Sequence, residues 1–85
     1  MFRDIGFGKD EAENLKLRAE LMMRIEDFYE KSGMTQAKAA KLLELTTPRL
    51  NALLKGKITL FSLDALVNIA TRAGLSVRLQ VKKAA

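Results

Sequence analysis

The spacing of apolar residues changes along the chain and marks where one structural element ends and the next begins. Over residues 10–31, apolar side chains recur every three or four positions among charged ones, which predicts a single long amphipathic helix. Asp10 followed by Glu13 resembles a capping box at the start of this helix. Ser32 and Gly33 are typical of its end.

Two shorter helical segments follow within residues 35–56, joined by a turn of about four residues. Thr35 is suited to cap the first segment, Thr46 or Thr47 the second, and Gly56 closes the second. These lengths match a helix-turn-helix motif, in which the first helix crosses the DNA backbone and the second enters the major groove.

The two faces of this pair differ in chemistry. A small side chain is needed where the helices cross, and Ala40 fits there; the leucines expected to hold the pair together are Leu43, Leu45, Leu50 and Leu53. The other face of the second helix is small, polar and basic, with no acidic residue: Thr47, Pro48, Asn51, Ala52 and Lys55. Any αα-hairpin can show the leucine pattern, so it is the polar face that indicates an approach to DNA.

A further helix is predicted over residues 62–73, and beyond it the apolar period falls to two. This alternation predicts a β-strand over residues 75–82 whose apolar face is Leu75, Val77, Leu79 and Val81. A lone strand has unpaired N–H and C=O groups, so we expect it to pair with the same strand of a second copy and form a two-fold dimer. The alternatives are that it packs on its own domain or pairs with the weak strand candidate FRDIGF near the N-terminus.

Composition restricts the classes of function. The chain has 85 residues, enough for a single domain over residues 1–85, and it contains no cysteine and no histidine. These absences remove the commonest zinc ligands, the usual general base and any disulfide, so we expect no enzyme, no metal and no cofactor. No apolar run approaches the roughly 20 residues of a membrane span, and the N-terminus lacks the apolar region of a secretory signal, so we expect a cytoplasmic protein without membrane contact.

The net charge of +5 is unevenly distributed. Residues 1–34 hold six Lys/Arg and eight Asp/Glu, whereas residues 35–85 hold nine Lys/Arg and only Glu44 and Asp64 as acids. A strongly basic second part favours a polyanionic partner such as nucleic acid. A basic soluble protein without such a partner would have the same balance.

The segment TQAKAAKLLELTTPRLNALLKGK resembles the helix-turn-helix of the XRE class, which includes the phage repressors and Cro; Gln36, Ala40 and the pair Gly56-Lys57 match its pattern. The longer pattern PR-x-x-x-L-x-x-G-K-I-x-x-F-S-x-D-x-L is similar to the HigA-like antitoxin branch, and the resemblance covers most of the chain. It implies an all-α, compact four- to five-helix phage-repressor-like domain with a short C-terminal strand used in dimerisation. One departure is Glu44, where the family often has glycine.

The resemblance also implies a function and its residues. The protein would be a homodimeric transcriptional repressor on a near-palindromic double-stranded DNA operator, the antitoxin of a RelE/HigB-like toxin, and would repress its own operon. The implied DNA-binding residues are Gln36, Lys38, Thr46, Thr47, Pro48, Arg49, Asn51, Lys55 and Lys57.

Within this set, Arg49 can contact guanine or clamp a phosphate, and Asn51 can contact adenine or the DNA backbone. The lysines and Gln36 are candidates for phosphate contacts. Gln36 can equally be an ordinary polar residue of a first helical turn, and Arg49 a solvated charge or the partner of an acid on the long first helix. The rival function is a protein-interaction module that binds a basic toxin through its acidic N-terminal helix.

Overall fold

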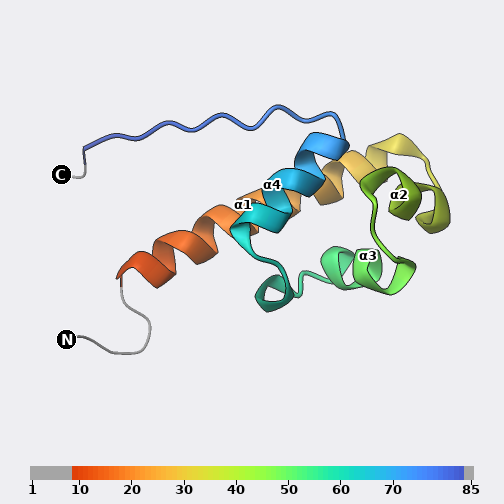
Figure 1. Ribbon diagram of the computed structural model, residues 1–85, viewed down its shortest axis with the longest axis horizontal. Coiled ribbons are helices and arrows are strands. Elements are labelled where there is room, and N and C mark those ends of the chain that lie inside the picture. Colours follow the sequence, from red (N-terminus) through yellow and green to blue (C-terminus); the bar gives the residue numbers. More distant parts are fainter. Residues whose placement is uncertain (1–8, 84–85) are drawn as a thin grey trace.

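The computed structural model describes residues 9–83, and all secondary structure in this range is helical (Figure 1). Four α-helices and one short 3-10 helix follow each other along the chain: α1 (Lys9–Ser32), α2 (Gln36–Leu43), α3 (Thr47–Leu54), η1 (Ile58–Leu60) and α4 (Leu63–Arg72). The two outer helices confirm the predicted segments to within one residue at each end. None of the helices in the described range is long and apolar enough to cross a membrane.

The long helix α1 is the support on which the other elements pack. The helix α4 lies along α1, while α2 and α3 pack together next to the second half of α1 (Figure 1). One continuous apolar core joins the four helices: Met22, Ile25, Ala39, Ala40, Leu43, Leu50, Leu53, Phe61, Leu66, Ile69, Ala70 and Ala73. Apolar burial of this kind stabilises a small domain by about 25 cal/mol per Å².

Three short polar residues fix where the later helices begin. The hydroxyls of Thr35, Thr46 and Ser62 each accept a hydrogen bond from the backbone N–H three residues further on, at 3.1–3.2 Å. Each satisfies one of the N–H groups that the first helical turn leaves without an intrahelical partner. At the other end of α1, Gly33 takes the left-handed conformation that ends a helix.

The prediction that Asp10 and Glu13 form a capping box is wrong. Lys9 is already helical, and Asp10 lies within the first turn of α1 and not at its N-cap. An acidic residue in a first turn still interacts favourably with the positive end of the helix dipole, so its charge has a role there without a capping bond.

The strand predicted over residues 75–82 is not formed in the described chain. Residues 75–83 are extended but carry no strand pairing, and they run back past α4 in Figure 1. A β-strand is defined by hydrogen bonds to a neighbouring strand, and the described part of this single chain offers none. The alternative partner FRDIGF lies outside the described residues.

Candidate nucleic-acid interface

The pair α2–α3 has the packing expected of a helix-turn-helix. Ala40 lies in the core at 3% exposure, consistent with the requirement for a small side chain where the helices cross. Leu43, Leu50 and Leu53 are fully buried, and Leu45 packs half-buried beneath the turn. The leucine framework predicted from the sequence is therefore confirmed.

The turn between α2 and α3 is built on a residue in the left-handed conformation. Glu44 has φ +57° and ψ +43° and follows the last residue of α2. Its N–H donates to the carbonyl of Lys41 at 3.2 Å, and the N–H of Leu45 donates to that of Ala40 at 2.8 Å. These bonds satisfy carbonyl groups at the end of α2 in the manner of a Schellman ending, in which glycine is the usual residue at this position.

Arg72, the last residue of α4, contacts this turn through its guanidinium group. Its Nη1 donates to the carbonyl of Leu43 at 3.4 Å, and its Nε lies 3.7 Å from Oε1 of Glu44. The carboxylate that replaces the usual glycine is thus turned toward a cation of its own domain. The sequence pattern gives no indication of this role for Arg72.

The start of α3 resolves the choice between the two threonines. Thr46 is the N-cap and accepts a bond from the N–H of Arg49 at 3.2 Å, which leaves Thr47 and Pro48 as the first two helical residues. Proline is suited to this turn because its fixed φ matches the helix and its missing N–H would have no intrahelical partner. Thr47, Pro48 and Arg49 are all exposed, so the first turn of α3 presents them to solvent.

The other predicted DNA-binding residues lie on α2, further along α3 and just after the end of α3. Gln36 and Lys38 are exposed in the first turn of α2, and Asn51 is half-buried on α3. Lys55 and Lys57 are exposed and follow the C-terminal end of α3. Because α3 has eight residues and is about 12 Å long, these lysines are separated from its first turn by about that distance. The candidate residues therefore lie in three places: the start of α3, the first turn of α2, and the segment that follows the end of α3.

Arg49 makes a contact that the sequence pattern does not indicate. Its guanidinium carbon lies 4.4 Å from the ring centroid of Phe61, within the distance of a cation–π interaction. Phe61 itself is fully buried. Arg49 is an exposed residue and forms no ion pair among the described residues, so the predicted alternative of a salt bridge to α1 is not found there.

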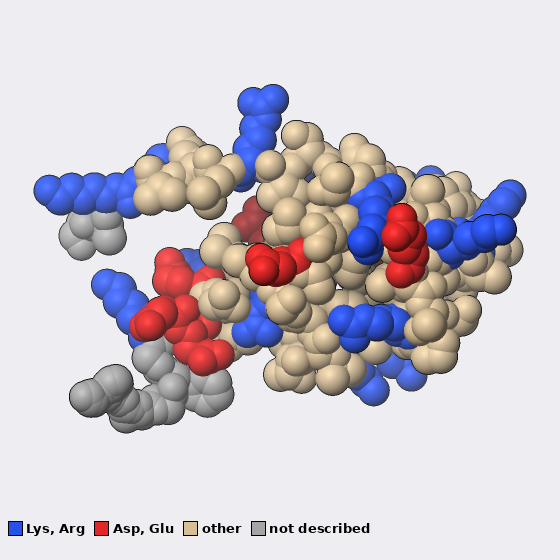
Figure 2. Space-filling model, viewed as in Figure 1, with Lys and Arg blue, Asp and Glu red and all other residues tan. Residues whose placement is uncertain are grey.

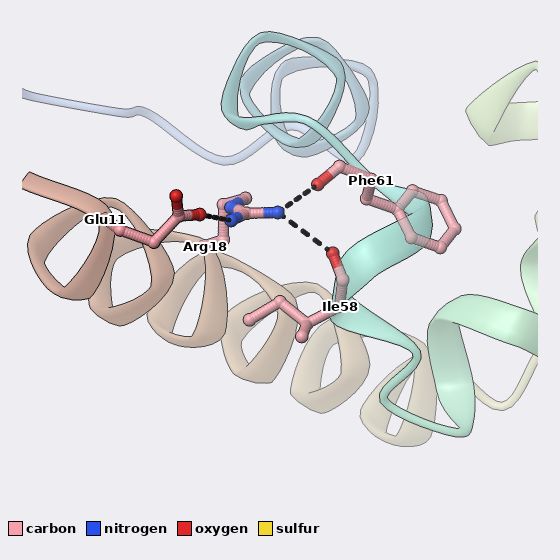
Figure 3. A network of polar contacts seen from close by, with 4 residues as sticks. All are labelled: Glu11, Arg18, Ile58 and Phe61. Carbon is pink, nitrogen blue, oxygen red and sulfur yellow. Dashed lines mark hydrogen bonds and ion pairs between the residues drawn. The ribbon is translucent and has the colours of Figure 1, made fainter. Parts of the chain in front are cut away.

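Arg18, on α1, binds the backbone of the segment that carries Phe61 (Figure 3). Nη1 of Arg18 donates to the carbonyl of Ile58, the first residue of η1, at 3.2 Å and to that of Phe61, which follows η1, at 3.3 Å. Its Nη2 lies 4.0 Å from Glu11, and the side chain is only 12% exposed. The sequence holds a signal for this role, because Arg18 lies four residues before Met22 and seven before Ile25, on the face of α1 that enters the core.

Charge is separated along the molecule. The helix α1 has seven acidic and five basic residues, whereas residues 35–57 have five basic residues and Glu44 as the single acid. Figure 2 shows Lys and Arg at the end of the molecule formed by α2 and α3 and again along the C-terminal segment, while most of the visible Asp and Glu lie near the first half of α1. The basic end formed by α2 and α3 is the one that carries the exposed first turn of α3.

Comparison with known proteins gives one family and a similar solved structure. A family model described as a helix-turn-helix domain matches residues 1–82. A solved structure described as "Putative XRE Family Transcriptional Regulator" superposes with a TM-score of 0.80 at 23% sequence identity, over 87% of this chain and 83% of that one. No curated protein matches the chain. The family match spans almost the whole sequence, so the chain belongs to the helix-turn-helix domain family.

Proposed function

We propose that the protein is a sequence-specific DNA-binding transcriptional regulator that places α3 in the major groove. The observation that carries the proposal is the exposed first turn of α3, which presents Thr47, Pro48 and Arg49 without an acidic residue. The helix-turn-helix packing behind it and the excess of basic residues over 35–57 support the same assignment. The structure named above as an XRE-family regulator shares this fold.

The residues of this surface divide into two groups by chemistry. Thr47, Arg49 and Asn51 lie on α3 and have side chains that can contact base edges, with Arg49 suited to guanine O6 and N7. The others suit phosphates, which position a protein on DNA without specifying sequence: Gln36, Lys38, Lys55 and Lys57. Gln36 is the first residue of α2, where free backbone N–H groups and the helix dipole both favour an anion.

We propose a homodimer in which the C-terminal segments pair. In this segment, residues 75–83, Leu79 is 86% and Val81 81% exposed, whereas Leu75 packs half-buried against the core. The part of the segment up to Leu79 lines a groove of about 420 Å³ together with Leu17 of α1 and Val67 of α4. Pairing of two such segments would satisfy their free backbone groups and bury the exposed apolar side chains between the two copies. Two α3 helices about one DNA turn apart, roughly 34 Å, would then read a near-palindromic operator.

The more specific role that we propose is repression of its own operon as the antitoxin of a RelE/HigB-like toxin in the bacterial cytoplasm. Support comes from the family resemblance of the sequence and from the acidic excess of α1, which suits a basic partner. A protein-interaction module that neutralises such a partner with little DNA binding is the second candidate. The exposed Met23 among the acids Glu20, Glu26 and Asp27 favours it, because an apolar side chain framed by charges is typical of a protein contact.

A salt titration tests DNA binding and separates the two candidates. Three lysines per subunit, Lys38, Lys55 and Lys57, give six phosphate contacts in a dimer, so log K should fall with log[salt] with a slope of about −5. Lys55→Gln should reduce the magnitude of this slope by about 2, because it removes one contact from each subunit. Lys16→Gln on α1 is the matched control; this lysine is exposed but lies on the acidic helix, and the slope should not change. DNA affinity that does not depend on salt would refute phosphate-dominated binding. A protein that binds a basic toxin but shows no salt-dependent DNA binding would favour the second candidate.

A truncation tests the dimer. Deleting residues 75–85 should give monomers in sedimentation equilibrium. A point substitution on the apolar face, Leu79→Glu, should weaken the dimer, whereas Gln80→Glu adds the same charge to the other face and should leave it intact. A truncated protein that remains dimeric would refute pairing through this segment.

A further inference from the structure

We propose that Phe61 and Arg18 are positioning residues that hold Arg49 ready for base recognition. The inference rests on the proposed function and adds a determinant of specificity that lies outside the helix-turn-helix itself. Phe61 follows η1 and Arg18 lies on α1, so neither is on the exposed surface of α2 or α3.

The first step is the stack between Arg49 and Phe61. The ring of Phe61 is fully buried, and the guanidinium of Arg49, an exposed residue, lies 4.4 Å from its centroid. An arginine stacked on a ring is restricted in orientation, while the N–H groups at the edge of its plane stay free to donate. Those are the groups that form the paired hydrogen bonds to guanine O6 and N7.

The backbone at the base of Arg49 is fixed as well. Its N–H donates to the hydroxyl of Thr46 at 3.2 Å, and the next residue, Leu50, is fully buried. The helix cap fixes the backbone of Arg49, and the ring of Phe61 fixes its guanidinium group. DNA binding therefore does not have to restrict a freely moving arginine side chain. Ordering of a long side chain on binding lowers affinity, so a side chain held in place beforehand favours it.

The second step is the anchor of Phe61 on α1. Nη1 of Arg18 donates to the carbonyl of Phe61 and to that of Ile58, which fixes the short η1 segment at both ends against α1 (Figure 3). The nearly buried Arg18 side chain has Glu11 as its charged partner at 4.0 Å. A helix distant in sequence from the motif thereby sets the position of the ring on which Arg49 rests.

The experiment measures selectivity, because the ratio of two affinities does not depend on the fraction of folded protein. The probes are a duplex enriched by the wild-type protein from a random-sequence library and the same duplex with its base pairs shuffled. For each half-site, Arg49→Ala should lower the ratio of the two affinities by about 5- to 150-fold, the range of a lost bidentate base contact. Phe61→Leu should lower it by about 2- to 30-fold for each half-site, the range of a cation–π interaction, and a dimer on two half-sites multiplies either effect by itself.

A double-mutant cycle distinguishes positioning from general damage to the core. If Phe61 acts through Arg49, Phe61→Leu should cause no further loss of selectivity once Arg49 is alanine. Ile69→Ala is the matched control, a truncation of another core residue, on α4, which should lower stability and leave the ratio unchanged. Should Phe61→Leu fail to fold, Arg18→Gln loosens the same ring through its backbone carbonyl and should lower the ratio in the same direction.

Three results would overturn the inference. An unchanged or increased ratio in Phe61→Leu would mean that the stack does not prepare Arg49 for DNA. An equal loss in the presence and absence of Arg49 would assign the effect to the core. If the wild-type protein bound the enriched and shuffled duplexes with equal, salt-dependent affinity, it would bind DNA without the selectivity on which the inference depends. If it showed no salt-dependent binding to either duplex, the proposed function itself would be refuted.

Discussion

Replacing Glu44 by alanine and by glycine separates two contributions to the stability of the turn between α2 and α3. Glu44 is the one non-glycine residue with positive φ among those that the structure describes, and its carboxylate lies 3.7 Å from Arg72. Both substitutions remove the carboxylate. Only the glycine variant also removes the Cβ that makes the left-handed conformation unfavourable.

The two contributions have different expected sizes. The ion pair is largely solvated, with the Glu44 side chain 69% exposed, so its loss should lower the free energy of unfolding by no more than about 1 kcal/mol. Relief of the left-handed strain is on the order of 1 kcal/mol in favour of glycine. We therefore expect Glu44→Ala to be less stable than the wild type, and Glu44→Gly to be more stable than Glu44→Ala by about 1 kcal/mol.

Thermal or urea unfolding of the three proteins measures this difference. For a domain of this size, about 1 kcal/mol corresponds to a shift of roughly 4–8 °C in Tm. Arg72→Met in the wild-type background is the control, because it removes the ion pair and the bond from Arg72 to the carbonyl of Leu43 while leaving the residue type at position 44 unchanged. Equal stability of the alanine and glycine variants would refute the assignment of strain to this turn. Both variants remove one negative charge, so any effect of that charge on DNA affinity should be the same in the two.

Two further substitutions test the motif at single positions. Thr46→Ala should lower the free energy of unfolding by about 1 kcal/mol through loss of the cap of α3, while Thr47→Ala, which removes no capping bond, should change it by less than about 0.5 kcal/mol in the same urea titration. Equal effects would contradict the assignment of Thr46 as the cap. Ala40→Leu should destabilise by about 1–3 kcal/mol because the side chain at the helix crossing is buried, and Ala37→Leu on the exposed side of α2 is its control. A tolerated leucine at residue 40 would show that α2 and α3 do not pack closely there.

The helices were predictable because the interactions that define them are local. The bonds of Thr35, Thr46 and Ser62 each reach only three residues along the chain. Apolar spacing alone then identified the buried leucines of the motif. The choice between Thr46 and Thr47 was left open because two adjacent residues of the same type have the same capping chemistry, and only the observed start of α3 distinguishes them.

The arginine contacts were not predictable in the same way. Arg18 reaches a carbonyl 43 residues away and Arg72 one 29 residues away, and a sequence pattern does not indicate where so long a side chain ends. Arg49 was selected as a candidate for base contact from its place on the exposed helix, but its ring partner lies outside the motif. Charge and position identify such residues as candidates, and the tertiary packing determines which group each of them contacts.

The C-terminal segment shows how far an alternating pattern constrains a structure. A period of two determines that Leu75, Val77, Leu79 and Val81 share a face, but the hydrogen bonds of a strand come from a second segment that the pattern does not identify. The pattern still restricts any pairing of two tails. A shift of one residue in one strand would turn its apolar side chains to the face opposite those of its partner, so only registers that keep the apolar faces together are compatible with burial. This is why a charge at Leu79 should disrupt the dimer and the same charge at the neighbouring Gln80 should not.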